Sequence, residues 1–552
     1  MNHKLHCPCS LFAFMIGAAV IFNAGTLWGN SATWTGGSST SNNWNDTANW
    51  SGGVQPTGGG ANSTIHYTQG GRTTSNNDYG DDSQFQQILF DNTITSSSYT
   101  LTGSRIKLFD VSGDGITGKI ENNSSILQTI SFNGASGFSL LLESSFEIDP
   151  TQGDLTINNG VLLDFNTPTL NVFGNNGHVL TFNGAITQNS TGSFSLNDND
   201  IVIFNGSNNY SGNTTIKAGE LRFGQNGSSN NSTILLGNTI GTAASATVTM
   251  LGSAQTLSSP MTVQSGNGGE AVLRSQNSNG TTNNWNGTIT LNKDLTVATT
   301  NSGATLNTAQ MLSGTPGTAR TISVGSASTT NNGTVAFTGS ADNTDIAATV
   351  NSGALLLNKT SSSGVHSVGS GLTVNNGGTA LLGNSSGDQI FVNSFVTINS
   401  GGTFKTQGFS EGSSASGATR GVGALTLQGG ATIDFATGAN GSTLSAASGV
   451  VSGAGTISIK NWTGISSTDN GSATNDRLLF QTDPNFSALQ LAQFQFYDDS
   501  GTAFNMGAIE IAFNGWTEIV PVPEPGTWIG AALLLGSLFV SQRRRLFRLL
   551  CQ

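Results

Sequence analysis

The chain carries little charge, few prolines and almost no cysteine. Charged residues make up 9% of its 552 positions, whereas about 25% is usual for soluble domains. Its three cysteines, Cys7, Cys9 and Cys551, all lie in the terminal segments. The body between them therefore has no disulfide, no thiolate metal site and no cysteine nucleophile.

Basic residues are especially scarce in the body. The formal net charge is −12, and five of the 19 Lys and Arg residues lie near the two ends. An acidic body argues against nucleic acid or an anionic membrane surface as its partner, although calcium or a neutral glycan remains compatible. Glycine is abundant at 74 residues, and Val, Ile, Leu and Phe recur in short alternating runs. This pattern favours a thin, turn-rich β structure over disorder.

The N-terminus has the pattern of a signal peptide. Lys4 precedes an apolar run from Leu11 to Phe22, and the small residues of 23–25 follow that run. A positive start, a short apolar core and a small-residue exit are typical of secretory signals. We therefore predict a signal peptide over residues 1–29 and export of the chain.

The C-terminus has three parts in a fixed order. Val522-Pro523-Glu524-Pro525 precedes an apolar run that begins at Trp528, and a basic cluster follows the run. The run is shorter than the roughly 20 residues of a comfortable membrane span, and its basic end should stay cytoplasmic. The predicted membrane anchor consists of Trp528, Leu533, Leu534, Leu535, Phe539, Arg543, Arg544 and Arg545.

These residues resemble the PEP-CTERM sorting signal, which combines a Pro-Glu-Pro motif, a short apolar helix and a basic tail. The resemblance covers the sequence from about Val522 to its last residue. It implies recognition by an exosortase-type processing enzyme, cleavage near the motif and delivery to the exterior, often alongside exopolysaccharide. The alternative is a plain tail anchor, for which two prolines flanking a single Glu have no obvious purpose.

A short pattern recurs along the body. It consists of Thr, an apolar residue, two polar or small residues, and Gly. Thr and its apolar neighbour favour a strand, and the Asn, Ser and Gly that follow allow the chain to turn. The pattern begins at Thr156, Thr215, Thr262, Thr349, Thr373, Thr397 and Thr426.

The spacing of this pattern predicts a solenoid. The starts at Thr349, Thr373 and Thr397 are 24 residues apart, and Thr215 and Thr262 are separated by nearly twice that length. One such unit cannot bury its own apolar face, whereas stacked units can. Asn residues at equivalent turns are expected to form hydrogen-bonded ladders along the stack.

The stretch from Asn208 to Leu221, which contains Tyr-Ser-Gly and Thr-Thr-Ile, resembles the autotransporter-associated β-strand repeat. The resemblance implies a right-handed parallel β-helix. We therefore expect an all-β fold, an elongated right-handed parallel β-helix with a short C-terminal hydrophobic helix. Because the chain ends in a sorting tail, self-export through a membrane β-barrel is not implied.

Aromatic residues follow two patterns. Phe-Asn-Gly occurs at Phe132, Phe182 and Phe204, and Phe337 and Trp285 occupy related motifs; we interpret these rings as core filling, with an exposed sugar-stacking ladder as the alternative. Near the N-terminus, large aromatics suit a cap over the first rung, and a glycan contact is the alternative function for them. These residues are Trp34, Trp44 and Trp50.

The organisation predicted from these features has five parts. Residues 1–29 are the signal peptide, 30–100 the N-terminal cap and first rungs, and 101–460 the solenoid repeats. Residues 461–520 form a C-terminal cap that ends in a linker over Trp516 to Pro521, and residues 521–552 form the sorting and membrane segment.

Candidate catalytic residues are sparse. A polysaccharide-degrading β-helix needs paired carboxylates or an Asp cluster that holds calcium, and no His pair at metal-ligand spacing occurs. The candidate acids are Asp198 with Asp200, Asp110 with Asp114, and Glu143, Glu147 and Asp149, while the body's histidines are His66, His178 and His366.

We therefore expect a non-catalytic structural or adhesive protein of the cell surface or extracellular matrix. It would be anchored transiently or stably in the inner membrane and would need no cofactor or metal. Its partners would be an exosortase-type enzyme, the membrane and exopolysaccharide. Two alternatives are a glycan-degrading β-helix enzyme and a glycan-binding module built on the N-terminal aromatics.

Overall fold

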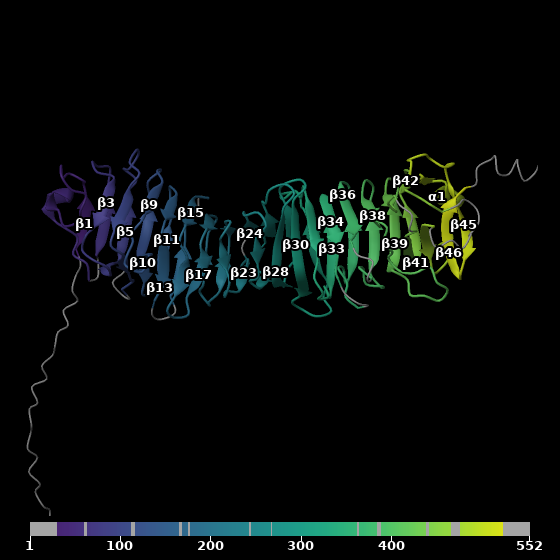
Figure 1. Ribbon diagram of the computed structural model, residues 1–552, viewed down its shortest axis with the longest axis horizontal. Helices are drawn as coiled ribbons and strands as arrows, with labels where there is room; N and C mark the ends of the chain where they lie inside the picture. Colours follow the sequence, from purple (N-terminus) through teal and green to yellow (C-terminus); the bar gives the residue numbers. More distant parts are fainter. Residues whose placement is uncertain are drawn as a thin grey trace, which may run out of the picture.

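The computed structural model shows one elongated stack of short strands (Figure 1). It describes residues 30–522 except 60–62, 112–115, 165–167, 175–176, 242–243, 267, 361–363, 384–387, 438–440 and 465–474. The strands stack along a single axis, from β1 at one end of the body to β45 and β46 at the other. The prediction of an elongated parallel β-helix is confirmed.

One sheet of 20 strands runs the length of the body, and every pair of neighbours in it is parallel. Its strands are β1 (Ser31–Trp34), β2 (Thr64–Tyr67), β5 (Gln87–Phe90), β8 (Lys119–Asn122), β11 (Phe146–Asp149), β14 (Thr169–Val172), β17 (Ser193–Leu196), β20 (Thr214–Ile216), β23 (Ile234–Leu236), β25 (Thr256–Leu257), β26 (Met261–Val263), β28 (Thr282–Leu291), β30 (Thr305–Ser313), β32 (Thr334–Phe337), β34 (Gly353–Leu357), β36 (Gly378–Leu382), β38 (Thr403–Lys405), β40 (Thr432–Asp434), β42 (Ile457–Lys460) and β44 (Phe494–Phe496).

A second long sheet lies beside the first and is parallel as far as β43. Its strands are β3 (Thr74–Asn77), β6 (Thr100–Gly103), β9 (Gln128–Ile130), β12 (Leu155–Ile157), β15 (Val179–Phe182), β18 (Ile201–Phe204), β21 (Gly219–Phe223), β24 (Ala246–Met250), β27 (Ala271–Ser275), β29 (Leu295–Thr299), β31 (Arg320–Val324), β33 (Ile346–Val350), β35 (Gly371–Val374), β37 (Phe395–Ile398), β39 (Val422–Gln428), β41 (Thr443–Ser452), β43 (Arg477–Phe480), β45 (Ala508–Phe513) and β46 (Trp516–Pro521).

Shorter sheets form a third side of the rungs. A five-stranded parallel sheet occupies this side in the N-terminal part, and one pair of two-residue strands follows it. Further along, single parallel bridges such as Val368 with Ile390 take their place. The strands are β4 (Ser83–Phe85), β7 (Ile106–Leu108), β10 (Phe138–Leu142), β13 (Gly160–Leu163) and β16 (Ile186–Gln188), then β19 (Ser207–Asn208) and β22 (Ser228–Ser229).

The recurring Thr motif marks one strand and the turn after it. Thr349 pairs with Thr373, and Thr373 pairs with Thr397, so the 24-residue step is the rung length in this region. The copies at Thr215 and Thr262, however, belong to the other long sheet. The motif therefore labels a strand-turn unit that either sheet can use, which explains why the pattern breaks between Thr262 and Thr349.

Asparagine side chains link successive turns, as predicted. The Asn375 amide donates to Asn351 Oδ1 at 2.7 Å, and Asn399 donates to Asn375 at 2.6 Å. The same arrangement joins Asn158, Asn183 and Asn205 at 2.9 and 2.8 Å. Each amide both donates and accepts, so identical residues in register satisfy one another.

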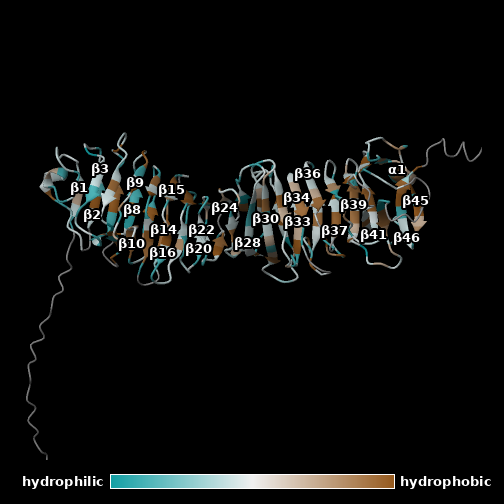
Figure 2. Cartoon of the chain, viewed as in Figure 1, coloured by the Kyte–Doolittle hydropathy of each residue, from teal (hydrophilic) through white to brown (hydrophobic). Residues whose placement is uncertain are grey.

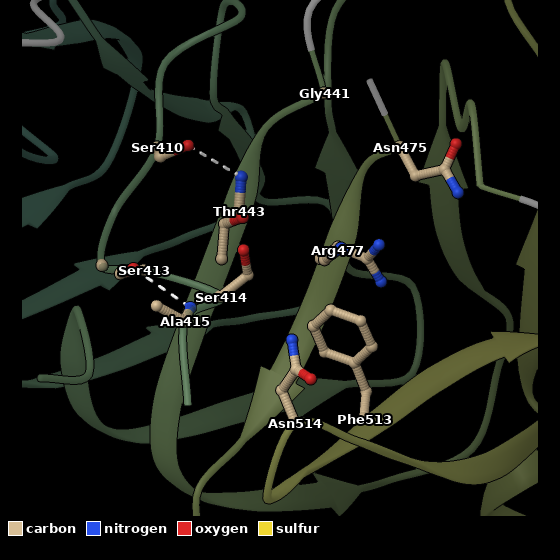
Figure 3. A pocket seen from close by; sticks show the side chains of 11 residues that line it. Ser410, Ser413, Ser414, Ala415, Gly441, Thr443, Asn475, Arg477, Phe513 and Asn514 are labelled. Atoms are coloured by element: carbon tan, nitrogen blue, oxygen red, sulfur yellow. Dashed lines mark hydrogen bonds between the residues drawn. The ribbon is translucent and has the colours of Figure 1, made fainter. Parts of the chain in front are cut away.

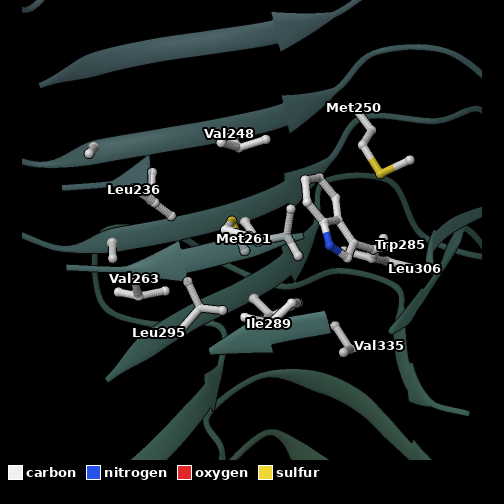
Figure 4. Close-up of a cluster of buried hydrophobic side chains, with 14 of the residues drawn as sticks. Leu236, Val248, Met250, Met261, Val263, Trp285, Ile289, Leu295, Leu306 and Val335 are labelled. Atoms are coloured by element: carbon white, nitrogen blue, oxygen red, sulfur yellow. The ribbon is translucent and has the colours of Figure 1, made fainter. Parts of the chain in front are cut away.

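The interior is one continuous hydrophobic cluster that extends from Ala32 to Val520. Alternate side chains of each strand point inward, and Figure 2 shows hydrophobic residues along the whole body. Figure 4 shows part of this cluster across several rungs, where the Trp285 ring lies near Met250 and Leu306. The described rungs share this cluster, so each depends on its neighbours for burial.

Buried amides also join the rungs from within. In each case a side-chain oxygen accepts a hydrogen bond from a main-chain N–H of an earlier rung, at 2.7 to 3.0 Å. A buried N–H without an acceptor would be costly, so these amides stabilise the stack. They are Asn208, Asn283, Asn331, Asn343 and Gln389.

The last rung is covered by an antiparallel hairpin. β45 pairs with β46, and β46 pairs antiparallel with β43. Asn514 and Gly515 have φ of 49° and 83°, which fits a two-residue type I′ turn. The predicted linker over Trp516 to Pro521 is therefore wrong: this segment is β46, and it closes the edge of the second sheet.

The region predicted as a C-terminal cap also contains a short helix. The one α-helix among the described residues is the single turn α1 (Ala488–Leu491). Ser487 and Gln490 form a capping box at the start of this helix. The hydrophobic helix predicted beyond Trp528 lies outside the described residues.

Candidate functional site

The three N-terminal tryptophans form the cap and are buried. Trp34 and Trp44 have no exposed surface and Trp50 is 3% exposed. Their indole N–H groups donate to Arg72 O, Ser75 Oγ and Trp44 O, respectively. A ring with no exposed face cannot stack on a sugar, so the alternative of a glycan contact on these residues does not hold in this structure.

The cap is built from these rings and two short 3-10 turns, η1 (Thr47–Asn49) and η2 (Ser51–Gly53). Trp34 forms an antiparallel bridge with Trp50, and their rings meet edge to face at 5.1 Å. The exposed edge of β1 is thereby shielded from pairing with other chains.

The rings of the Phe-Asn-Gly motifs also lie in the core. The prediction of core filling is confirmed, and the alternative of an exposed sugar-stacking ladder is wrong. Phe132, Phe182, Phe204, Phe337 and Trp285 are each at most 1% exposed.

The predicted acidic pair Asp198 and Asp200 does not form an open calcium loop. Asp200 is fully buried, and its Oδ1 accepts hydrogen bonds from the main-chain N–H groups of Gly177 and His178. Its carboxylate thus fixes the turn of a neighbouring rung. Asp110 accepts from Gly118 N at 2.8 Å, and Asp114 lies outside the described residues.

Of the remaining predicted acids, Glu147 and Asp149 lie on β11, and Glu143 directly follows β10. Glu143 pairs with Lys107 at 2.7 Å. Burial, together with Glu147, raises the pKa of Asp149 to about 7, and burial also raises the pKa of Glu147. Lys119 faces Glu147 across the register. Lys119, Glu147 and Asp149 therefore lie together on the neighbouring strands β8 and β11.

Each histidine of the body pairs with an aspartate on its own part of the solenoid. His66 lies 3.3 Å from Asp91, His178 3.6 Å from Asp154 and His366 3.2 Å from Asp342. Within the described residues, no group of three or more His, Cys, Asp or Glu side chains is arranged to hold a metal ion.

A polar pocket of about 420 Å³ lies at the C-terminal end of the stack; we call it the C-terminal pocket (Figure 3). One wall is a small excursion of the chain that is closed by an antiparallel bridge between Gly412 and Arg420. The opposite wall consists of β41, β43 and the hairpin turn. The lining residues are Ser410, Gly412, Ser413, Ser414, Ala415, Gly441, Thr443, Asn475, Arg477, Phe513 and Asn514.

Specific contacts hold these walls in place. The Ala415 carbonyl accepts a hydrogen bond from Trp516 Nε1 at 3.2 Å, which ties the excursion to the hairpin. Ser410 Oγ accepts from Thr443 N at 3.0 Å, and Ser413 Oγ accepts from Ala415 N at 3.2 Å; both contacts are drawn in Figure 3.

Arg477 forms the base of the pocket without giving it a net charge. Its Nη1 donates to both carboxylate oxygens of Glu518, at 3.2 and 3.1 Å. The guanidinium carbon also lies 3.8 Å from the centre of the Phe513 ring. Both members of the ion pair are almost completely buried, so the arrangement is fixed and electrically neutral.

A second polar feature borders this pocket. Glu411 is fully buried, and its two oxygens accept hydrogen bonds from Gln389 N at 3.2 Å and Ile390 N at 3.1 Å. Its carboxyl group thus does what the buried Asn and Gln side chains do in other rungs. Burial and the nearby Asp388 carboxyl raise the pKa of Glu411 well above its usual value, and burial raises that of Asp388 as well. We call these two residues the carboxyl pair.

Sequence reasoning identified neither of these features. The pocket combines an excursion, two strands and a hairpin turn that are far apart in the chain, and its serines and asparagines resemble those of every other turn. Arg477 was the one available signal, as a rare basic residue beside Asp476 in a region where the repeat changes.

The sorting motif meets the end of the described chain. Val522, the residue after β46, is described, whereas Pro523, Glu524, Pro525 and the predicted membrane anchor lie outside the described residues, as does the predicted signal peptide. Among the helices of the described part, none is both long and apolar enough to cross a membrane.

Comparison of the chain with protein-family models, with curated proteins and with solved structures gives no match.

Proposed function

We propose that the chain is an exported, non-catalytic structural or adhesive protein of the cell surface or extracellular matrix. It would associate with exopolysaccharide, and an exosortase-type enzyme would sort it through the C-terminal tail. The observation that carries this proposal is the uninterrupted solenoid with one continuous core, covered by aromatics at one end and a hairpin at the other. Such a body supplies length and a repeating polar surface.

The chemistry of the exterior supports a hydrated, uncharged partner. Asn ladders and Ser and Thr side chains repeat along the stack, and they offer many donors and acceptors of moderate strength. Charged residues are few and the net charge is negative, which disfavours polyanions. Polysaccharide hydroxyls match this surface, and many weak contacts along a long body add up through multivalency.

The two ends support export and sorting. A cysteine-free body suits an exterior location where folding relies on stacking in place of disulfides. β46 ends at Pro521, one residue before the Val522-Pro523-Glu524-Pro525 motif. The motif therefore begins directly after the last strand of the described body.

Replacing Pro523 and Pro525 with alanine is expected to abolish sorting. In a host with an exosortase, the wild-type full chain should appear at the surface or in the medium without its C-terminal tail. The double variant should remain in the membrane fraction with the tail attached, as followed by an epitope placed after Gln552. Pro484→Ala, in a loop of the cap, is the matched control. Equal release of the double variant and the control would contradict the sorting proposal.

Incubation with a panel of polysaccharides separates the structural proposal from the enzymatic alternative. We expect the full chain in mild detergent to be retained on at least one neutral polysaccharide, with no new reducing ends after prolonged incubation. Retention is measured by affinity electrophoresis and cleavage by a reducing-sugar assay. Production of reducing ends by the purified chain would favour the glycan-degrading alternative.

A further inference from the structure

The C-terminal pocket has the lining expected for a polyhydroxylated ligand. Its volume of about 420 Å³ lies in the usual range of small-molecule sites, but most such sites are lined mainly by apolar side chains. Here three serines, one threonine and two asparagines surround a single aromatic residue. Side chains that both donate and accept hydrogen bonds match a ligand whose hydroxyls do the same.

The electrostatics of the pocket favour an uncharged ligand. Among the eleven lining residues, Arg477 is the ionisable one, and the Glu518 carboxylate offsets its charge through contacts at 3.1 and 3.2 Å. An anionic sugar would have to compete with Glu518 for the guanidinium, at the cost of leaving a buried carboxylate without its partner. A neutral sugar leaves this pair intact.

The position of the polar groups is fixed before a ligand arrives. Asn514 sits in the type I′ turn between β45 and β46, where a positive φ of 49° is required. Figure 3 shows its side chain beside Phe513, with Arg477 and the serines of the excursion around the same space. The excursion is anchored to the hairpin through Trp516. Pre-positioned groups lower the entropic cost of binding.

We propose that the C-terminal pocket binds one neutral sugar residue of a glycan, at a chain end or a branch. The inference rests on the proposed association with exopolysaccharide and goes further by naming the site and the ligand class. Hydroxyls of the sugar pair with Ser414, Asn475 and Asn514. The solenoid exterior then holds the polymer weakly along its length, while the pocket adds one saturable site.

Asn514→Gly tests this site without straining the turn, because glycine adopts the same positive φ. The probes are neutral oligosaccharides of two to four residues, based on glucose, galactose, mannose or xylose, with a uronic-acid oligosaccharide for comparison. Binding to the full chain in mild detergent is measured by titration calorimetry. We expect one-to-one binding of at least one neutral probe, weakened about tenfold in the variant by loss of the amide hydrogen bonds.

Asn485→Gly is the matched control, since Asn485 also has a positive φ, of 50°, and lies outside the pocket. It should leave binding unchanged, and both variants should keep the unfolding temperature of the wild type. A second variant, Ser414→Trp, should block the pocket and abolish binding.

The outcomes separate this inference from the proposed function. If the chain is retained on polysaccharide but binds no neutral probe at millimolar concentration, the pocket assignment is overturned and the proposed function stands. Equal binding by the wild type and both pocket variants overturns it too, as does a preference for the uronic-acid probe. If the wild-type chain is neither retained on polysaccharide nor able to bind a probe, both the proposed function and the pocket assignment are overturned.

Discussion

Asp388→Asn is expected to stabilise the C-terminal rungs at neutral pH. Glu411 is fully buried and accepts two main-chain hydrogen bonds, while the Asp388 carboxyl adds a like charge beside it. An amide at position 388 removes that charge and can donate a hydrogen bond to Glu411. Hydrogen bonds to charged groups contribute about 1.5–3 kcal/mol, and we expect a gain in unfolding free energy of that order.

The gain depends on pH in a defined direction. The pKa of Glu411 is higher in the folded chain than in the unfolded chain, where it is about 4.3. Protonation of Glu411 therefore makes its full contribution to the free energy of unfolding when the pH is below about 4.3. That contribution is lost as the pH rises through the raised folded pKa. The wild type should therefore lose stability from about pH 4.3 upward, and the variant should lose less. The two should converge in acid.

Hydrogen exchange at Gln389 and Ile390 measures this locally, because their N–H groups donate to Glu411. At neutral pH their exchange should be about tenfold to a hundredfold slower in Asp388→Asn, which corresponds to the expected free energy. Asp342, His366 and Lys359 also lie near the carboxyl pair, and burial lowers the pKa of Lys359 to about 8. The control Asp483→Asn changes an exposed loop. If the exchange rates at Gln389 and Ile390 depended on pH in the same way in the wild type and the variant, Asp388 would have no effect on Glu411.

The repeat could be predicted because it is local. Thr349, Thr373 and Thr397 recur at the rung length, and the Asn that begins each turn meets its counterpart one rung away. A period in the sequence becomes a register in space when every unit stacks on the next. The core positions followed from strand alternation, including the rings of the Phe-Asn-Gly motifs.

Features without a period could not be predicted in this way. Trp516 to Pro521 contains a charged residue, Glu518, and ends in a proline, so its sequence resembles a linker. Arg477, 41 residues earlier, supplies the partner that lets Glu518 be buried in a strand. Glu411 lies in a Gly- and Ser-rich stretch whose sequence resembles a turn. That it is buried, at a position where other rungs have Asn or Gln, follows from how the rungs stack. Contacts between residues that occupy different positions of the repeat do not change the spacing of the sequence motif.

Trp44→Ala is expected to have the largest effect on stability, at the N-terminal end. The ring is fully buried, lies 5.5 to 6.2 Å from the rings of Trp50, Tyr79, Phe85 and Phe132, and donates to Ser75 Oγ at 2.7 Å. Truncating a buried Trp costs about 3–5 kcal/mol. The first rungs are stabilised by contacts from one side only, so a loss of this size is enough to unfold them while the rest of the stack stays folded.

We expect peptides from residues 31–103 of Trp44→Ala to exchange hydrogen rapidly, while those of the C-terminal rungs stay protected. The uncovered edge of β1 and β2 should also promote self-association, visible by size-exclusion chromatography of the full chain in mild detergent. Trp44→Phe is the matched control: it keeps a ring in the cluster but loses the Nε1 hydrogen bond, so its loss of protection should be smaller. If Trp44→Ala instead left protection unchanged and abolished only retention on polysaccharide, Trp44 would be a glycan contact and the cap would have to be located elsewhere.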